Sequence, residues 1–183
     1  MKHFFTNALT GLRSMVLLTI ILGIMYPVAV WATGQVIAKD KADGSILSHD
    51  GHPVGSALIA QQFEGDEWLW PRPSAANYDG AASAGSNLGP NSPELLQQVK
   101  ERRAQFGKDA PADALTASSS GLDPDISPEW AAQQVDRIAK ARGIDAGTVK
   151  HCVSAATSDR MLGFLGEPTV NVLKTNLCLA GDA

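Results

Sequence analysis

The sequence has no acidic residue before Asp40, although the 183-residue chain carries 19 Asp and Glu against 15 Lys and Arg. Up to Ala38 only Lys2 and Arg13 supply Lys or Arg charge, so this leader carries +2 and the remainder −6. A uniform globular domain does not divide its charge in this way. The two parts of the chain are therefore predicted to lie in different surroundings.

Charged side chains of either sign are absent from Ser14 to Ala38, a run of 25 residues without Lys, Arg, Asp, Glu or His. As an α-helix this run spans about 37 Å, which exceeds the roughly 30 Å of a bilayer's hydrocarbon core. We expect a transmembrane helix over residues 14–38. A purely cytoplasmic enzyme is not expected.

A cleavable signal peptide is the alternative, because Val30-Trp31-Ala32 resembles a cleavage site. The apolar run is longer than the roughly 7 to 15 residues of a signal peptide, which favours a permanent anchor. Gly23 and Pro27 predict a kink or a close contact with another membrane helix. The acidic bulk beyond the span favours a cytoplasmic tail over residues 1–13 and a soluble periplasmic domain over residues 39–183.

Clusters of basic residues and cysteine motifs are also missing. Scattered Lys and Arg in an acidic domain argue against nucleic-acid binding. Cys152 and Cys178, the only cysteines, have no CxxC spacing, so a zinc site is not expected. They are either small buried core residues, which is the favoured interpretation, or one disulfide in an oxidising compartment.

Beyond the membrane span, turn-forming residues predict a linker or the entrance to a strand over residues 39–55. The apolar run from Ala57 to Phe63 predicts a strand. From Trp68 to Asn91 the Pro and Gly content excludes long regular elements. This predicts a structured loop of about 25 residues, longer than loops that lack a function usually are.

Two predicted helices have the same pattern of residues at their start and end. Ser92 and Ser127 are predicted N-caps, each is followed by Pro and Glu, and Gly107 and Gly143 are predicted ends. A third, shorter helix is expected after Asp145. The segment from residue 168 to residue 179 is predicted to be β-rich. The fold class is therefore a single amino-terminal transmembrane helix plus one α+β soluble domain.

No catalytic or metal-binding pattern in the sequence is complete. His49 and His52 lack a third metal ligand, and Ser118-Ser119-Ser120 lacks the glycines of a nucleophile elbow. We predict no catalytic residue, no metal site and no cofactor of the protein's own. A membrane-anchored periplasmic hydrolase or binding protein remains the alternative.

Three features are better explained by structure or by partner contact. The loop Gly85-Ser86-Asn87 is a weak candidate for cradling an anion, because it lacks the lysine of a P-loop. Arg72 is either a packed ion pair or a cation offered to a partner by an aromatic platform. Asp123 resembles half of a carboxylate pair, but loop and helix-entrance chemistry explains it better.

Several separated motifs follow one another along the chain: Trp70-Pro71-Arg72-Pro73-Ser74-Ala75, Tyr78, Ser83 to Pro90, Ala117-Ser118, Ser120 to Pro124, Ile126-Ser127-Pro128, Gly166-Glu167-Pro168, Val170 to Leu173 and Asn176-Leu177. In sequence and order these motifs resemble the C subunit of the bacterial Kdp potassium-transporting P-type ATPase, and the resemblance covers essentially the whole chain. Ala84, where a second glycine is expected, makes phosphate binding by its loop less plausible.

The resemblance implies an accessory subunit of an inner-membrane complex. Its partners would be a channel-like potassium-binding subunit, a P-type ATPase subunit and a small hydrophobic peptide, and ATP and potassium would be handled by those partners. The family is described as needed for assembly and as a catalytic chaperone that raises the ATP affinity of the pumping subunit. Its soluble domain is placed over the potassium entrance. Our partner-contact candidates are Trp70, Arg72, Ser74, Tyr78, Asn87, Asp123, Gly23 and Pro27.

Overall fold

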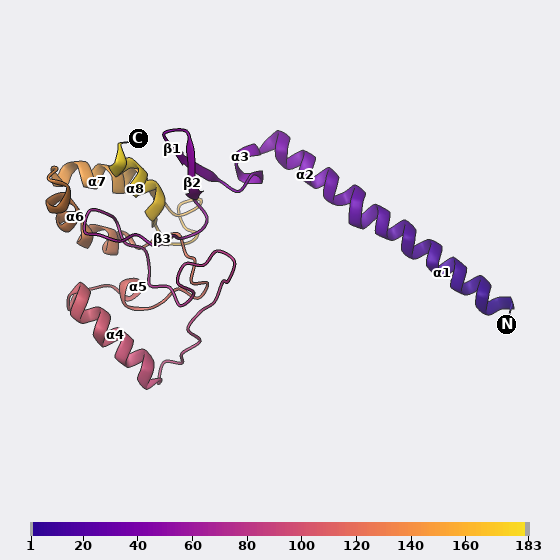
Figure 1. Ribbon diagram of the computed structural model, residues 1–183, viewed down its shortest axis with the longest axis horizontal. Coiled ribbons are helices and arrows are strands. Elements are labelled where there is room, and N and C mark those ends of the chain that lie inside the picture. Colours follow the sequence, from indigo (N-terminus) through magenta and orange to yellow (C-terminus); the bar gives the residue numbers. More distant parts are fainter. Residues whose placement is uncertain (1, 182–183) are drawn as a thin grey trace. The chain divides into compact units, whose positions relative to one another are not determined.

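A computed structural model describes residues 2–181 and, from residue 4 onward, their side chains. The chain divides after Ser45 into an amino-terminal helical unit and a second unit that begins at Ile46. Long helical structure in the first unit and mixed helices and strands in the second confirm the predicted fold class. Figure 1 shows the elements of both units.

The first unit is a nearly continuous helix. It consists of α1 (Lys2–Ile20), a π-helical turn η1 (Ile21–Met25) and α2 (Tyr26–Ile37), followed by the short α3 (Lys39–Ala42). The stretch Phe4–Ile37 is long and apolar enough to cross a membrane. Its helical region extends beyond the predicted residues 14–38 on the amino-terminal side.

The π-helical turn lies where the sequence predicts a kink. Pro27 has no N–H to donate to the carbonyl of Gly23, four residues earlier, so regular α-helical bonding cannot continue there. The Tyr26 N–H donates instead to the Ile21 carbonyl, five residues earlier. Gly23 and Pro27 therefore belong to one local widening of the helix.

The second unit contains two small antiparallel sheets. β1 (Ile46–His49) pairs with β2 (His52–Ser56). The other sheet has the order β3-β5-β4, with β5 (Thr169–Asn171) between β3 (Asp125–Ile126) and β4 (Thr157–Ser158). Residues 57–92, all of which the structure describes, form neither a helix nor a strand.

The predicted strand from Ala57 to Phe63 is wrong. Ala57 and Ala60 are buried, but the segment is a turn whose Ala60 N–H donates to the Leu122 carbonyl 3.0 Å away. The apolar residues of this segment are therefore explained by burial against a neighbouring loop and not by a strand. The long loop predicted from Trp68 to Asn91 is confirmed.

The helices of the second unit begin at the predicted caps. The Ser92 hydroxyl accepts from the Leu95 N–H at the start of α4 (Pro93–Phe106), and the Ser127 hydroxyl accepts from Trp130 at the start of α6 (Pro128–Arg142). Asp145 caps α7 (Ala146–Ala155). A short α5 (Ala112–Leu115) lies between α4 and β3.

The β-rich end predicted from residue 168 is wrong beyond Asn171. The Asn171 side chain accepts from the Lys174 N–H and starts α8 (Val172–Ala180), which ends at Gly181 in the left-handed conformation. An N-cap here outweighs the β-branched residues on either side of it. Only three residues of the predicted segment form a strand.

The buried core gathers around α6, α7, α8 and the central strand β5. Ile138, Val149 and Val170 are fully buried there. The favoured interpretation of the cysteines as free thiols is wrong, because Cys152 on α7 and Cys178 on α8 form a disulfide with their Cα atoms 5.5 Å apart. The bridge joins two core helices.

Candidate functional site

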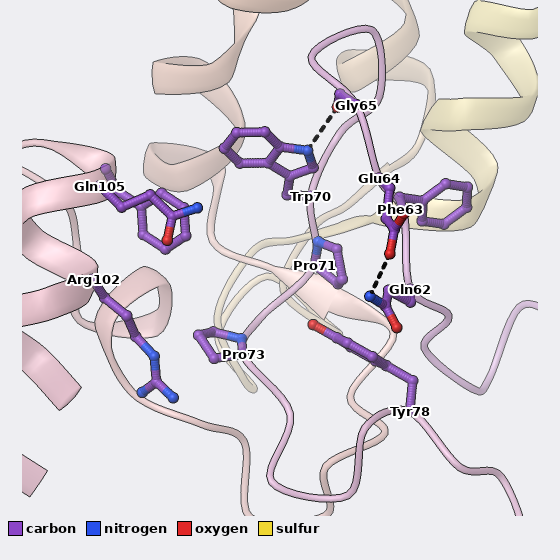
Figure 2. Close-up of a pocket in the computed structure, with 11 residues that line it drawn as sticks. Gln62, Phe63, Glu64, Gly65, Trp70, Pro71, Pro73, Tyr78, Arg102 and Gln105 are labelled. Atoms are coloured by element: carbon purple, nitrogen blue, oxygen red, sulfur yellow. Dashed lines mark hydrogen bonds between the residues drawn. The ribbon is translucent and has the colours of Figure 1, made fainter. Parts of the chain in front are cut away.

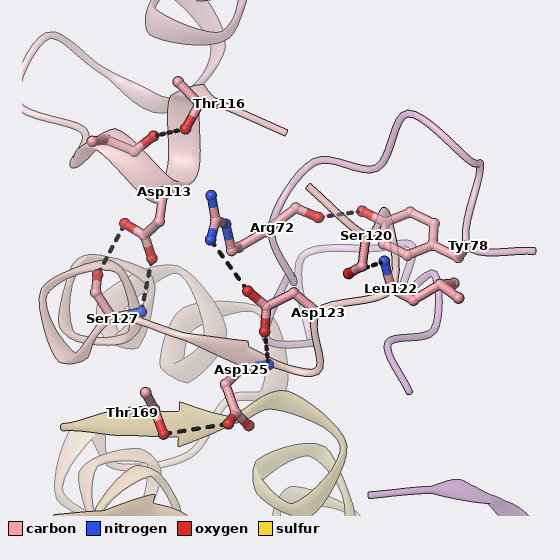
Figure 3. A network of polar contacts seen from close by, with 11 residues as sticks. Arg72, Tyr78, Asp113, Thr116, Ser120, Leu122, Asp123, Asp125, Ser127 and Thr169 are labelled. Atoms are coloured by element: carbon pink, nitrogen blue, oxygen red, sulfur yellow. Dashed lines mark hydrogen bonds and ion pairs between the residues drawn. The ribbon is translucent and has the colours of Figure 1, made fainter. Parts of the chain in front are cut away.

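Five of the predicted contact residues lie in one region of the second unit. Trp70, Arg72, Ser74 and Tyr78 belong to residues 68–78, which we call the platform loop, and Asp123 ends residues 118–123, which we call the support loop. Figure 2 shows Trp70 and Tyr78, and Figure 3 shows Arg72, Tyr78 and Asp123. The two loops are linked by side-chain and backbone contacts, described below.

Ser74 organises the platform loop. Its hydroxyl donates to the Gly121 carbonyl at 2.7 Å and accepts from the N–H groups of Ala76 and Tyr78, each at 3.0 Å. The Tyr78 hydroxyl donates back to the Arg72 carbonyl at 2.8 Å. One serine thus folds the loop on itself and attaches it to the support loop.

Arg72 and Asp123 form an ion pair between the two loops at 3.2 Å, with side chains that are 25% and 33% exposed (Figure 3). Asp123 also accepts from the Asp125 N–H. Of the two interpretations of Arg72 that the sequence offers, a packed ion pair or a cation offered to a partner, the structure shows the ion pair. The buried Nε of Arg72 has no acceptor within the part of the chain that the structure describes.

Close packing of backbone explains two glycines. A Cβ on Gly85 would lie 2.6 Å from the Ser119 carbonyl oxygen, and one on Gly121 would lie 2.6 Å from that of Ala84. Gly121 also has a φ of +67°, which favours glycine. The Gly85 segment therefore packs against the support loop. Ser86 and Asn87 are exposed beside it, and Asn87 has a φ of +53°.

Side chains of α6 contact both the backbone and the ring of Trp70. Gln134 accepts from its N–H at 2.8 Å and donates to its carbonyl at 3.2 Å, while the Trp70 Nε1 donates to the Gly65 carbonyl. The guanidinium carbon of Arg137 lies 3.5 Å from the centre of the Trp70 ring. The indole is thereby fixed in position rather than free to rotate.

The preceding residue is held in the same way from α8. Asn176 accepts from the Leu69 N–H at 2.8 Å and donates to the Leu69 carbonyl at 3.0 Å. Both side chains are essentially buried, so the backbone groups of Leu69 are satisfied away from water. Two amide side chains from two helices therefore replace a neighbouring strand at the start of the platform loop.

A pocket of about 410 Å³ lies beside the platform loop, as Figure 2 shows. Its apolar lining includes Trp70, Pro71, Pro73 and Phe106, and Arg102 reaches it from α4. Arg102 donates to the Leu115 carbonyl at 2.8 Å. An aromatic and proline surface with one cation at its border is suited to contact with another molecule.

Burial changes the acid–base properties of three groups around the site. Desolvation raises the pKa of Tyr78, and nearby Arg102 opposes this to a smaller extent. Desolvation lowers the pKa of Arg102 and lowers the pKa of Arg137 to about 10, where Asp66 and Glu67 oppose it. At neutral pH both arginines stay cationic and Tyr78 stays protonated.

The residues of the hydrolase alternative have structural contacts. Ser118 is buried, and its N–H donates to the Pro73 carbonyl. The Ser120 hydroxyl accepts from the Leu122 N–H, whereas His49 and His52 belong to the hairpin of β1 and β2. Within residues 4–181 no group of three or more His, Cys, Asp or Glu side chains is placed to hold a metal ion.

Sequence reasoning missed Gln134, Arg137 and Asn176. Gln134 is a polar residue on the inward face of α6 beside Val135, and a buried amide on an apolar face was the available signal. Asn176 lies in a segment that the sequence predicts to be β-rich, whereas it belongs to α8. Asn176-Leu177 is one of the motifs that carry the family resemblance, but neither that motif nor the residue type of Gln134 indicates which backbone groups these amides bind.

Comparisons with known proteins agree over nearly the whole chain. Residues 8–181 match the model of a family described as K⁺-transporting ATPase, c chain. A potassium-transporting ATPase KdpC subunit of Kineococcus radiotolerans is 49% identical over 100% of this chain and 97% of its own. Proteins of the same name from Cereibacter sphaeroides and Burkholderia vietnamiensis are 46% and 48% identical, over 95% and 88% of this chain and 96% and 89% of their own.

Proposed function

Because the chain belongs to the family of the c chain of K⁺-transporting ATPases, we propose that it is a non-catalytic accessory subunit needed to assemble an ATP-driven, high-affinity potassium uptake complex. Its partners are a channel-like potassium-binding subunit, a P-type ATPase subunit and a small hydrophobic peptide. They handle potassium and ATP. The observation that carries this proposal is the rigid platform loop, whose aromatic, proline and arginine side chains are fixed by contacts from α6, α8 and the support loop.

Rigidity supports a binding role because a surface that is ordered in advance loses little conformational entropy on association. Trp70, Arg72 and Tyr78 are also residue types that contribute strongly at protein interfaces. The Arg72–Asp123 pair orients the guanidinium, and its buried Nε leaves a donor without an acceptor in the described chain. We infer that this region contacts the channel-like subunit.

Co-purification tests the assembly role. The tagged full chain, extracted in mild detergent, is expected to retrieve a large ion-translocating protein and a P-type ATPase. Retrieval of neither would overturn the proposal. The double variant Arg72→Ala/Asp123→Ala removes the ion pair without leaving one charge unpaired, and it is expected to reduce retrieval. Glu101→Ala/Arg103→Ala, two exposed positions on α4, is the matched control.

We propose an amino-end-inside topology in the bacterial inner membrane, with the helical unit as a single-pass anchor and residues 39–183 in the periplasm. The disulfide between Cys152 and Cys178 supports this placement, because disulfides persist in oxidising compartments. Protease added outside intact spheroplasts is expected to remove the second unit. Full protection until the cells are lysed would place it inside.

In the periplasm, the acidic surface would favour potassium at the entrance. Only carboxylates near the entrance can attract potassium in this way, because salt screens exposed charges over about 8 Å at physiological ionic strength. Neutralising Asp43, Asp50, Glu64, Asp66 and Glu67 to their amides is expected to weaken apparent potassium affinity at low salt and less at high salt. An unchanged affinity at low salt would contradict this part.

The catalytic-chaperone role, raising the ATP affinity of the pumping subunit, is also proposed here. With the soluble unit in the periplasm and ATP in the cytoplasm, such an effect has to pass through membrane helices. ATPase activity of complexes with and without this subunit, measured against ATP concentration, is expected to show a higher ATP requirement in its absence. An equal ATP requirement of the two complexes would contradict the chaperone role, but it would not contradict the assembly role.

A further inference from the structure

The connection between β4 and β5 holds four large apolar side chains in solvent. Met161, Leu162, Phe164 and Leu165 are 70%, 77%, 71% and 47% exposed. We call these four residues the apolar tip. The other exposed large hydrophobic side chains described in the second unit are single residues or one pair: Ile46, Val54, Leu58, Ile59, Leu96 and Ile144. A contiguous apolar group of this kind is unusual on a soluble surface and indicates an interaction site.

The backbone of the apolar tip is closed on itself. Met161 and Leu165 exchange two hydrogen bonds of 2.9 Å, and the Phe164 N–H donates to the Met161 carbonyl at 3.3 Å. Gly163 donates to the Arg160 carbonyl at 3.1 Å. Many of its polar backbone groups therefore already have partners inside the loop, which is what a segment needs before it enters an apolar medium.

The two strands that carry the apolar tip are fixed to the core. β4 and β5 pair in register, Thr157 with Val170 and Ser158 with Thr169, and Val170 is fully buried in the core. Arg160 and Glu167 form an ion pair across the base of the loop. The apolar side chains are thus held outward by the fold, and the neighbouring opposite charges offset each other.

The connection between the apolar helix and the second unit is short, which keeps the second unit near a membrane that the helix crosses. The apolar helix ends at Ile37 and the second unit begins at Ile46, so residues 38–45 are the whole connection. Fully extended, that connection spans about 30 Å or less. Tethering makes contact with the bilayer effectively intramolecular, so that even weak insertion becomes favourable.

From these observations we infer that the apolar tip inserts into the interfacial region of the same bilayer that the amino-terminal helix crosses. The occupant of this surface is lipid, at the boundary between headgroups and acyl chains. A protruding tip with its backbone bonds closed suits a deformable lipid surface, whereas a protein partner would have to offer a matching pocket. This contact goes beyond the assembly role and does not require the other subunits.

A site-specific fluorescent probe tests the inference in the full chain. The chain has no free cysteine, because Cys152 and Cys178 are bridged. Phe164→Cys labelled with an environment-sensitive dye is placed in nanodiscs of phosphatidylethanolamine and phosphatidylglycerol, without other subunits. Brominated acyl chains are expected to quench most of its fluorescence. The same dye at Lys100→Cys, an exposed position on α4, is expected to keep its fluorescence.

Removing one apolar side chain provides the second measurement. Leu162 has a φ of +55°, a conformation that Asn adopts readily, so Leu162→Asn changes polarity with little backbone strain. It is expected to lower the quenching at position 164, whereas Leu96→Asn on α4 is expected to leave it unchanged. Unchanged quenching in Leu162→Asn would overturn the inference.

The lipid-only nanodiscs also separate this contact from a protein interface. Absence of quenching there overturns the inference, and shielding of the probe only after the remaining subunits are added would reassign the apolar tip to a protein partner. Loss of co-purification with those subunits, by contrast, bears on the proposed function and leaves the lipid-only result as it stands.

Discussion

Gln134 and Trp70 are joined by two hydrogen bonds, in which one side-chain amide satisfies both the N–H and the carbonyl of the tryptophan. Gln134 is 2% exposed, so neither bond is readily replaced by water. A loop without strand partners is thereby fixed to α6. The order of the platform loop depends on this amide and on Arg137 stacked over the same indole.

Gln134→Ala is expected to destabilise the folded chain by about 2 to 3 kcal/mol, because it leaves two partly buried backbone groups of Trp70 unpaired. Urea unfolding of the full chain in detergent measures the change. Gln133→Ala removes one exposed bond to the Asp109 carbonyl and is expected to cost less than about 1 kcal/mol. Equal effects at the two positions would contradict the role assigned to Gln134.

Gly121→Ala is expected to disturb the junction of the two loops and to lower both stability and partner retrieval. The new Cβ would lie 2.6 Å from the Ala84 carbonyl oxygen, at a φ of +67°. Gly85→Ala meets the Ser119 carbonyl and is expected to act in the same direction. Gly89→Ala, which meets nothing within 4 Å, is the control. Thermal unfolding that is unchanged in Gly121→Ala would show that the loops are not packed as described.

Removing the disulfide by Cys152→Ala/Cys178→Ala is expected to lower the free energy of unfolding by about 3 kcal/mol, since the bridge closes a sequence separation of 26 residues. Denaturant midpoints of the two proteins measure it. Non-reducing electrophoresis of protein taken from cells is the companion measurement. If thiol-blocked samples run identically before and after reduction, the cysteines are free in the cell.

The raised pKa of Tyr78 predicts a loss of folding stability at high pH. Its folded-state pKa is raised above 10.0, so its contribution is present below the unfolded pKa and is lost as the pH rises through the folded pKa. Tyr78→Phe removes the hydroxyl and is expected to cost about 1 kcal/mol at neutral pH. Its stability is then expected to fall less steeply than that of the unmodified chain above pH 10. Parallel curves would contradict the raised pKa.

Gly23→Leu is expected to weaken assembly more than Gly11→Leu. Both glycines lie on the apolar helix, but Gly23 is within the π-helical turn that precedes Pro27, where a close contact with another helix is predicted. A Cβ at Gly11 meets nothing within 4 Å, and one at Gly23 meets only Thr19 at 3.8 Å, so neither change strains the isolated chain. Co-purification in mild detergent compares the two. Equal retrieval would indicate that the turn does not contact a partner.

Local chemistry made several elements readable in advance. Ser92, Ser127 and Asp145 each start a helix because their side chains accept orphan N–H groups of the first turn, and this requires only nearby residues. The error at the carboxyl end has the same origin. Asn171 caps α8 in the same manner, but the β-branched residues on either side of it suggested a longer strand.

The candidate site was predictable as a set of residues and not as an arrangement. The Trp70 to Ser74 motif and Asp123 were identified from their order along the chain, while Trp70 and the preceding Leu69 are fixed by Gln134, Arg137 and Asn176, up to 107 residues away. No motif indicates what the amides of Gln134 and Asn176 bind, because their role is defined by the backbone they meet. The disulfide was left open for the same reason.

By itself the sequence determined the long apolar helix, the acidic remainder, the α+β class and the family, because these depend on composition, capping and ordered motifs. Only the tertiary structure decided that Cys152 and Cys178 meet, that Gly85 and Gly121 serve close packing, and that the apolar tip stands exposed. Each of these depends on which distant segments come within a few ångströms of one another. That proximity is set by the packing of the whole core and is not encoded in any short stretch of chain.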